Sequence, residues 1–302
     1  MVDVTASHDR PSSASDYVAL LKPRVMSLVV FTGLAGYVAA PGAGDWVLGF
    51  AVILSIAIAA GASGALNMWF DSDIDLTMTR TRSRPIPSGR VARDEALTMG
   101  LTLSVLAVVT MYLAAGLLAA GLLAFTIFFY AVVYTMWLKR LTPHNIVIGG
   151  LAGALPPAIA WAAKTGSLTL DPIILVAIIF MWTPPHFWAL ALLQKDDYAA
   201  AKVPMLPVTH GAKATRLQIF VYSLLLAPLG LAPVLTGLGG VVYGAIAAFG
   251  GAFFLFLAYR VLRSRAGDGD KSMDKPARDL FGFSIIYLFA LFGAVLVEQA
   301  VA

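Results

Sequence analysis

The sequence predicts an all-α integral membrane protein with nine transmembrane helices and a cytoplasmic N-terminus. Of its 302 residues, 59% are hydrophobic and only 13% are charged, which suits a bundle surrounded by lipid rather than by water. The apolar stretches run for about 20 residues, the length of a helix that crosses a hydrocarbon layer of ~30 Å. The short alternating segments that a transmembrane β-barrel would need are not seen in the sequence.

The apolar stretches are separated by connections of two alternating kinds. The first, third, fifth and seventh connections ("PGAGD", "AAG", "AKTGSLTLD" and "TGLGG") are short and nearly uncharged, whereas the others carry the charge. We expect one domain over 17–302, a flexible loop over 263–279, and a polar tail over 1–16 that lacks the features of a cleaved signal peptide. The helices are expected near 20–40, 46–70, 95–114, 117–137, 146–163, 172–193, 215–236, 239–259 and 280–299.

The distribution of positive charge predicts the orientation. Every Lys and Arg except Lys164 lies in the N-terminal segment or in the charged connections and their flanks. Because cytoplasmic loops carry the excess of Lys and Arg, all of these segments are expected to face the cytoplasm. The formal charge of +4 therefore indicates topology, and no nucleic-acid partner is expected.

A polar cluster ends the second predicted helix. Asn67, Asp71 and Asp75 are spaced at i, i+4 and i+8, so they share one face if the helix continues to Asp75. Mg²⁺ prefers such oxygen ligands and commonly bridges to substrate phosphates, while the arginines that follow can bind phosphate oxygens. The cluster therefore predicts a site for Mg²⁺ and diphosphate at the cytoplasmic boundary.

The simpler interpretation is that these charges cap a helix and set the topology. We favour it for Asp73 and Arg82, but capping needs no third polar group two turns inside an apolar run. A second acidic pair, Asp196 and Asp197, follows the sixth predicted helix on the same side. Adjacent residues cannot share one helix face, so this pair alone is a weak signal of a second metal contact.

The pattern N-x-x-x-D-x-x-x-D resembles the first acidic motif of the intramembrane aromatic prenyltransferases related to the ubiquinone-pathway enzyme. Three stretches, "DIDLTMTRTRSRPIPSG", "YTMWLKRLTPHNIVIGGLAGALPPAIAWAA" and "TPPHFWALALLQKDDYAAAKVPMLP", are similar to the branch that farnesylates protoheme IX. The resemblance covers residues 17–299 and implies nine helices around a central cavity. The superfamily's second motif, D-x-x-x-D, is not matched, because Gln194 and Tyr198 stand at its ends.

The resemblance implies transfer of the farnesyl group of farnesyl diphosphate to a vinyl group of protoheme IX, with addition of water, to give heme O. Mg²⁺ would be the cofactor, held by Asp71 and Asp75 with help from Asn67 and from one or both of Asp196 and Asp197. The diphosphate would be bound by Arg80 and Arg84, and by Lys139 or Arg140. Ordinary loop charge is an equally good interpretation of the last two.

Aromatic faces can stabilise an allylic cation, and the candidates are Tyr130, Tyr134, Trp182, Phe187 and Trp188. Aromatic residues in membrane helices also serve as packing groups or interfacial anchors. His186 is interpreted as a heme contact, because an ionisable residue within a membrane helix usually has a function. The alternative is a hydrogen-bonded histidine beside Pro184–Pro185, which is expected to interrupt its helix as Pro156–Pro157 interrupts another.

The resemblance places the protein in the bacterial cytoplasmic membrane, with heme A synthase or an oxidase assembly factor as a partner. Three alternatives remain open at this stage. A prenyltransferase for a quinone precursor or a chlorophyllide would share the acidic site but not the heme-branch stretches. A transporter or channel would usually show internal repeats, which the sequence lacks, and a heme chaperone would not depend on Asp71.

Overall fold

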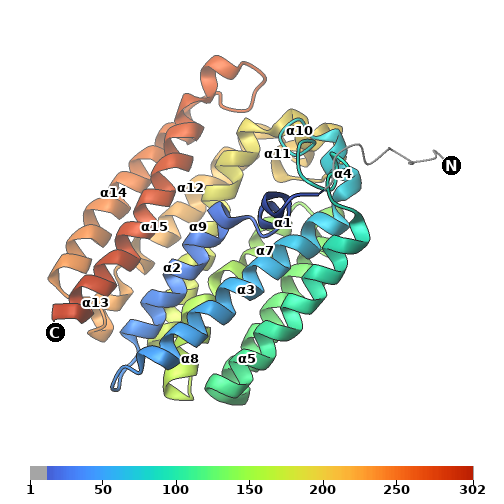
Figure 1. Ribbon diagram of the computed structural model, residues 1–302. Coiled ribbons are helices and arrows are strands. Elements are labelled where there is room, and N and C mark those ends of the chain that lie inside the picture. The colour runs from blue at the N-terminus through green and yellow to red at the C-terminus, as the bar shows by residue number, and fades with distance from the viewer. Residues whose placement is uncertain (1–11, 302) are drawn as a thin grey trace.

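A computed structural model describes residues 12–301, and every regular element in that range is a helix (Figure 1). Residues 1–11, most of the predicted polar tail, lie outside the described residues, and α1 begins within the rest of that tail. In chain order the helices are α1 (Ala14–Leu20), α2 (Pro23–Ala39), α3 (Trp46–Phe70), α4 (Ser72–Thr77), α5 (Arg93–Phe128), the π-helix η1 (Phe129–Leu138), α6 (Lys139–Leu141), α7 (Asn145–Ala154), α8 (Pro156–Thr165), α9 (Leu170–Leu193), α10 (Lys195–Ala200), α11 (Leu206–Thr209), α12 (Gly211–Leu229), α13 (Ala232–Thr236), α14 (Val241–Arg263), the 3₁₀-helix η2 (Lys271–Asp274) and α15 (Lys275–Val301).

The prediction of an all-helical membrane protein is confirmed. Within residues 12–301, seven helical stretches are long and apolar enough to cross a membrane. An eighth is added if α1 and α2, which meet at a bend of 53°, form one span. The count falls short of nine because residues 93–141 form one helical stretch of 49 residues where two separate spans are predicted.

This stretch consists of two helices that meet at Gly116. The backbone of Gly116 has φ +78° and ψ −172°, a conformation that glycine adopts without the steric cost of a β-carbon. A straight helix of 49 residues would be about 74 Å long at ~1.5 Å per residue, far more than a bilayer requires. The two halves correspond to the predicted helices at 95–114 and 117–137.

The two proline pairs have different effects on the backbone. Pro156 and Pro157 begin α8 directly after α7 has ended, so the predicted interruption is present there. The predicted interruption at Pro184–Pro185 is wrong, because α9 runs through both residues. These prolines remove only two backbone donors, and α9 is packed among α7, α8, α12 and α15, the kind of setting in which membrane helices tolerate proline.

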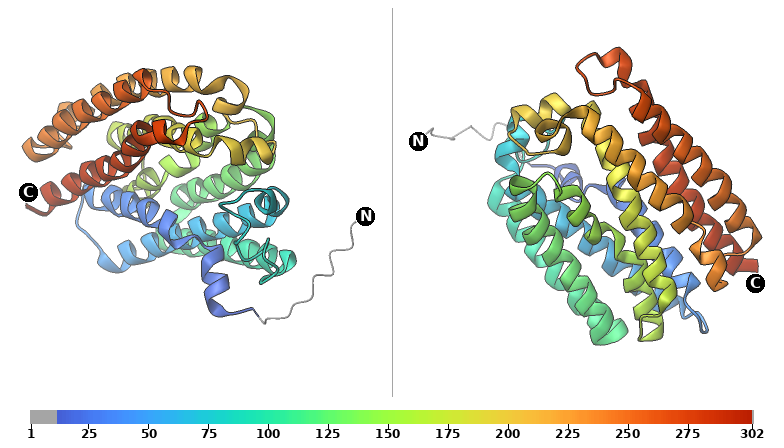
Figure 2. Two further views of the ribbon diagram at one scale, coloured as in Figure 1. Left: turned by 90° about the horizontal axis from the view of Figure 1, so that it is seen from above. Right: turned by 180° about the vertical axis from the view of Figure 1, so that it is seen from behind.

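The short elements α1, α4, α10 and α11 lie together at one end of the bundle, as two views show (Figures 1 and 2). We call this the basic end, and it also includes α6 and the loop 264–274. That loop was expected to be flexible, but hydrogen bonds hold both of its ends. Arg216 donates to the carbonyl oxygen of Ala266 at 2.6 Å, and the amide of Gly267 donates to Asp274 at 2.9 Å.

Helices α2 and α8 pack backbone against backbone at Gly36. A β-carbon on Gly36 would lie 2.3 Å from the carbonyl oxygen of Pro157 and 2.5 Å from its α-carbon. Because rigid backbone atoms form this contact, neither helix can relieve it by a side-chain rotation. The glycine therefore sets the separation of two helices that form part of the wall of the bundle.

We expect Gly36→Ala to destabilise the protein by about 1–3 kcal/mol, the usual cost of overpacking. The matched control is Gly121→Ala, also within a helix, where a β-carbon meets no atom within 4 Å. Since alanine favours helix, this control should be neutral or stabilising by up to about 1 kcal/mol. Thermal unfolding of the purified variants in detergent measures both effects, and equal midpoints would contradict the prediction.

Candidate active site at the basic end

Asn67, Asp71 and Asp75 lie at the junction of α3 and α4. The amide of Asp71 donates to the carbonyl of Asn67, and the amide of Asp75 to that of Asp71, both at 2.9 Å. Helical hydrogen bonding thus continues across the junction, although α3 itself ends at Phe70. The three side chains are buried, with 4%, 0% and 1% of their surfaces exposed.

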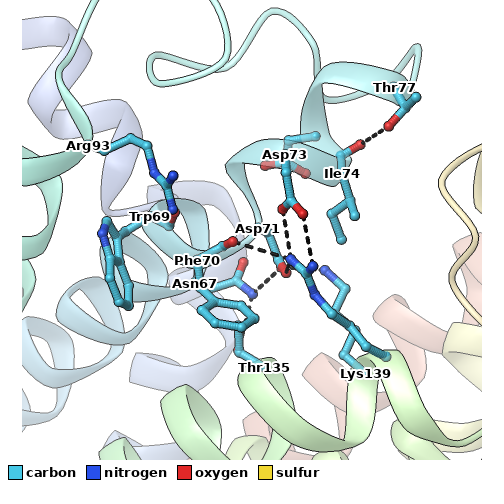
Figure 3. A network of polar contacts seen from close by, with 12 residues as sticks. Asn67, Trp69, Phe70, Asp71, Asp73, Ile74, Thr77, Arg93, Thr135 and Lys139 are labelled. Atoms are coloured by element: carbon cyan, nitrogen blue, oxygen red, sulfur yellow. Dashed lines mark hydrogen bonds and ion pairs between the residues drawn. The ribbon is translucent and has the colours of Figure 1, made fainter. Parts of the chain in front are cut away.

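Three cations from separate parts of the chain meet this polar cluster. Lys139 is paired with Oδ2 of Asp71, and the two side chains point toward each other in Figure 3. Lys22 Nζ donates to Oδ1 of Asn67 at 2.5 Å, and Arg84 is paired with Asp75 at 2.7 Å. The carboxylates predicted to bind metal and two cations predicted to bind diphosphate are therefore in direct contact.

Thr135 orients the amide of Asn67 from the facing π-helix. Asn67 Nδ2 donates to Asp71 Oδ2 at 2.7 Å and to Thr135 Oγ1 at 3.2 Å. Thr135 Oγ1 in turn donates to the carbonyl of Tyr130, five residues earlier, at 2.8 Å. Segments of π-helix are rare and often occur at functional sites, and here the π-helix ends directly before Lys139.

The sequence did not single out Thr135, or Lys22 as a site residue. No local pattern marks either of them, because their contacts join residues far apart in the chain. Lys22 was counted only among the positive charges that set the topology. A buried asparagine needs partners for its amide groups, so Asn67 implied such residues without identifying them.

The donor set is compatible with one magnesium ion shared with a substrate. Oδ1 of Asp71 is buried without a hydrogen-bond partner, and the guanidinium of Arg140 lies 3.8 Å from it. Among residues 12–301, no group of three or more His, Asp or Glu side chains is arranged to hold a metal ion. Mg²⁺ commonly uses only one or two carboxylates together with waters and substrate phosphates, so no complete protein cage is needed.

Arg140 is engaged differently from Lys139. Its guanidinium forms two hydrogen bonds with Asp73, at 2.8 and 2.7 Å, and lies 4.7 Å from the ring centroid of Phe70. The hydrogen bonds from Arg140 keep the pKa of Asp73 below its ordinary value. Arg140 thus fastens α6 to the α3–α4 junction, while Lys139 faces the buried carboxylate. Arg82 is exposed, as ordinary loop charge would be.

The two aspartates of the second acidic pair are in different environments. Asp197 accepts a hydrogen bond from the backbone amide of Arg80 at 3.3 Å, whereas Asp196 is exposed. Tyr198 lies close enough to Arg80 to feel its positive charge, but burial has the larger effect and raises the pKa of its phenol. The second motif therefore holds Arg80 and its loop against α10.

Four of the five aromatic candidates lie beside other residues of the predicted site, whereas Trp188 does not. Tyr130 and Tyr134 lie on the π-helix with ring centroids 5.4 Å apart, and Phe187 packs with the hydrophobic residues around α4. The ring of Trp182 is stacked on the ring of His186, with their centroids 4.3 Å apart. Trp188, by contrast, is buried in the hydrophobic core in a T-shaped contact with the ring of Tyr222, so its position matches the packing interpretation.

His186 is buried between α9 and α15. Its Nδ1 is 2.6 Å from Oγ of Ser284, and its ring is stacked against Trp182 and against Phe281, the latter at 4.6 Å. Only 8% of its surface is exposed. The hydrogen-bonded alternative is thus present for Nδ1, and it involves a neighbouring helix rather than the proline pair.

Comparisons with known proteins agree with this arrangement. The sequence profile described as the UbiA prenyltransferase family matches residues 28–297. A protein of Hyphomonas neptunium named protoheme IX farnesyltransferase is 59% identical, over 99% of this chain and 97% of its own length. One of the same name from Caulobacter vibrioides is 59% identical, over 94% of this chain and 90% of its own.

Solved structures share the fold. One, described as digeranylgeranylglyceryl phosphate synthase, is similar with a TM-score of 0.77 and 18% identity, covering 95% of this chain and 99% of its own. A UbiA homolog from Archaeoglobus fulgidus bound to DMAPP and Mg²⁺ gives a TM-score of 0.67 and 16% identity, covering 92% and 99%. Since the family profile covers most of the chain and the relatives share more than half of its residues, the chain belongs to the UbiA prenyltransferase family.

Proposed function

We propose that this protein transfers the farnesyl group of farnesyl diphosphate to a vinyl group of protoheme IX and, after addition of water, releases heme O and diphosphate. The observation that carries the proposal is the buried cluster of carboxylates and cations at the basic end. It combines groups suited to phosphate and to Mg²⁺ in one place. The relatives named protoheme IX farnesyltransferase support the choice of substrates.

The cations would bind the diphosphate. Lys139 and Arg84 are paired with carboxylates in this structure, and Lys22 with an amide oxygen. A diphosphate offers oxygens of higher charge, so these side chains can turn from their internal partners to the substrate. Arg80, whose backbone amide donates to Asp197 beside α10, would contact the same group. Arg140 would act mainly by holding α6 in position.

Asp71 and Asp75 would hold Mg²⁺, with Asn67 assisting once Lys22 has turned to the phosphate. The buried oxygen of Asp71 that lacks a partner supports this assignment. Asp197 is the more suitable of the second pair for a further contact, because Asp196 is exposed. When bound, Mg²⁺ stabilises the negative charge that develops on the leaving diphosphate.

The remaining residues would guide the carbon chemistry. Breaking the bond between the farnesyl C1 carbon and oxygen leaves an allylic cation, and both electrons go to the diphosphate. A vinyl carbon of the porphyrin then bonds to C1, and water adds to the second vinyl carbon with loss of a proton. Tyr130, Tyr134, Trp182 and Phe187 could stabilise the cation with their ring faces, and His186 would contact the heme.

The topology belongs to the same proposal. If the halves of residues 93–141 on either side of Gly116 each cross the bilayer, and α1 and α2 together cross once, the single domain has nine crossings. The basic end, with α1 and the active-site loops, would then face the cytoplasm of a bacterium, and a cytoplasmic N-terminus is part of the same proposal. The product would pass to heme A synthase or to a terminal-oxidase assembly partner.

Purified protein in lipid nanodiscs should convert protoheme IX and farnesyl diphosphate to heme O only when Mg²⁺ is present. Mass spectrometry of the extracted heme and an assay for released diphosphate measure the two products. EDTA should stop the reaction, and added Mg²⁺ should restore it. Consumption of farnesyl diphosphate with a quinone precursor or a chlorophyllide but not with protoheme would contradict the acceptor, and no release of diphosphate with any acceptor would contradict the reaction class.

Asp71→Asn and Asp75→Asn should each lower turnover by about 10²-fold or more, because they remove charge at the group that stabilises the departing diphosphate. Asp73→Asn is the matched control, since Asp73 lies between these residues and its side chain is largely exposed. It should stay within about threefold of the wild type. Single-turnover rates on correctly inserted protein decide the matter, and wild-type rates for both Asn variants would refute the metal assignment.

Lys139→Met and Arg140→Gln should separate the two adjacent cations. The loss of Lys139 should reduce turnover on the order of 10²-fold by removing a donor to the diphosphate. The loss of Arg140 should reduce it by less than about tenfold, because its partners are Asp73 and Phe70. The dependence of rate on farnesyl diphosphate concentration tests this, and equal losses in the two variants would contradict it.

A further inference from the structure

Ser284, on α15, is the common partner of two aromatic side chains on α9. Its carbonyl oxygen accepts a hydrogen bond from Trp182 Nε1 at 2.7 Å. Its hydroxyl oxygen lies 2.6 Å from His186 Nδ1. These contacts join segments that are 102 and 98 residues apart in the chain, and Ser284 is completely buried.

The hydrogen bonds of Ser284 determine which nitrogen of His186 carries the proton. The Ser284 hydroxyl has one hydrogen, which it donates to the carbonyl oxygen of Phe281 at 2.6 Å. With that hydrogen used, Oγ accepts from His186, and the arrangement that satisfies both 2.6 Å contacts therefore has a hydrogen on Nδ1. In the neutral imidazole, Nε2 is then the nitrogen with the free lone pair.

The rest of the surroundings leave Nε2 as the one reactive position of the ring. Trp182 and Phe281 stack on the two sides of the imidazole, with interplanar angles of 17° and 22°, and Phe187 contacts it edge-on. Within residues 12–301, Nε2 forms no hydrogen bond. It is also not one of the fully buried polar atoms that lack a partner, so part of its surface is accessible. A side chain that is about nine-tenths buried thus presents one unpartnered lone pair.

We infer that His186 Nε2 is an axial ligand of the iron of protoheme IX, and that Ser284 is the positioning residue that holds the ligating tautomer. This inference rests on the proposed function, which supplies the heme as a substrate. Histidine is a common heme ligand. A metal-binding histidine usually donates the N–H of its other ring nitrogen to an acceptor, which fixes the tautomer and raises the basicity of the ligating nitrogen.

The arrangement also explains the stacked rings. Trp182 and Phe281 prevent rotation of the imidazole, so Nε2 keeps one direction when the heme arrives. An iron bond of fixed direction would limit the position of the porphyrin, and with it the position of the vinyl groups. If His186 served only to connect α9 to α15, its hydrogen bond to Ser284 would be sufficient. That role would not explain why Nε2 is left accessible and without a partner.

The test uses purified full-length protein with protoheme IX and no prenyl diphosphate, so that binding is separated from turnover. The reduced complex should show the resonance Raman band of an iron–histidine bond. His186→Ala should remove this band and shift the Soret absorption. Ser284→Ala should lower the band's frequency, since Nδ1–H loses its acceptor, and weaken heme affinity by about tenfold. Ser284→Thr, which keeps the hydroxyl, should restore both.

Ser223→Ala is the matched control, because Ser223 is also completely buried and donates to a carbonyl of its own helix without contacting a histidine. It should leave the spectrum unchanged. An unchanged iron band in His186→Ala would overturn the ligation, and an unshifted band in Ser284→Ala would overturn the role of Ser284. Either result with normal heme O formation would refute this inference alone, whereas iron ligation without any farnesyl transfer would refute only the proposed function.

Discussion

The basic end of this protein depends on balancing charges that are buried beside a hydrophobic bundle. Asp71 and Asp75 have almost no exposed surface, and an ion removed from water costs several kcal/mol unless a partner compensates for it. Lys139 and Arg84 supply those partners from segments that follow α3 in the chain. The α3–α4 junction, α6 and the loop after α4 are consequently fixed to one another by electrostatics as well as by packing.

The same balance suits a site that must accept a highly charged substrate. In the proposed reaction, diphosphate and Mg²⁺ arrive with opposite charges. The phosphate oxygens can take the place of the carboxylates beside Lys139 and Arg84, while the metal takes the place of the cations beside Asp71 and Asp75. The sum of charge inside the site then changes little between its free and loaded states, so no carboxylate or ammonium group is left without a counter-charge.

Much of the architecture could be predicted from local sequence. The range 46–70 matches α3 because an unbroken apolar run ends there at a polar cluster, and 172–193 differs from α9 by two residues at its start. The link at Gly116 was harder to assign, since the apolar pattern continues through it. Proline was also an unreliable guide, because tertiary packing decided that α8 begins at Pro156 while α9 continues through Pro184.

Only part of the candidate site could be predicted from the sequence. The spacing of Asn67, Asp71 and Asp75 was informative because each follows the last by one helical turn. Lys22, Thr135 and Ser284 could not be found in this way, as their partners are 45 to 102 residues away. The difference between Lys139 and Arg140 was likewise hidden, because it arises from the direction of two neighbouring side chains.

The single-residue link at Gly116 has a consequence for the outer shape of the molecule. Gly116 and the short turns at 41–45, 166–169 and 237–240 connect the helices at the end of the bundle opposite to the basic end. That end therefore has few residues outside the long helices. Within residues 12–301, most of the short helices and the longer loops lie at the basic end (Figure 1). Most of the chain that could contact a water-soluble partner outside a bilayer therefore lies at the basic end.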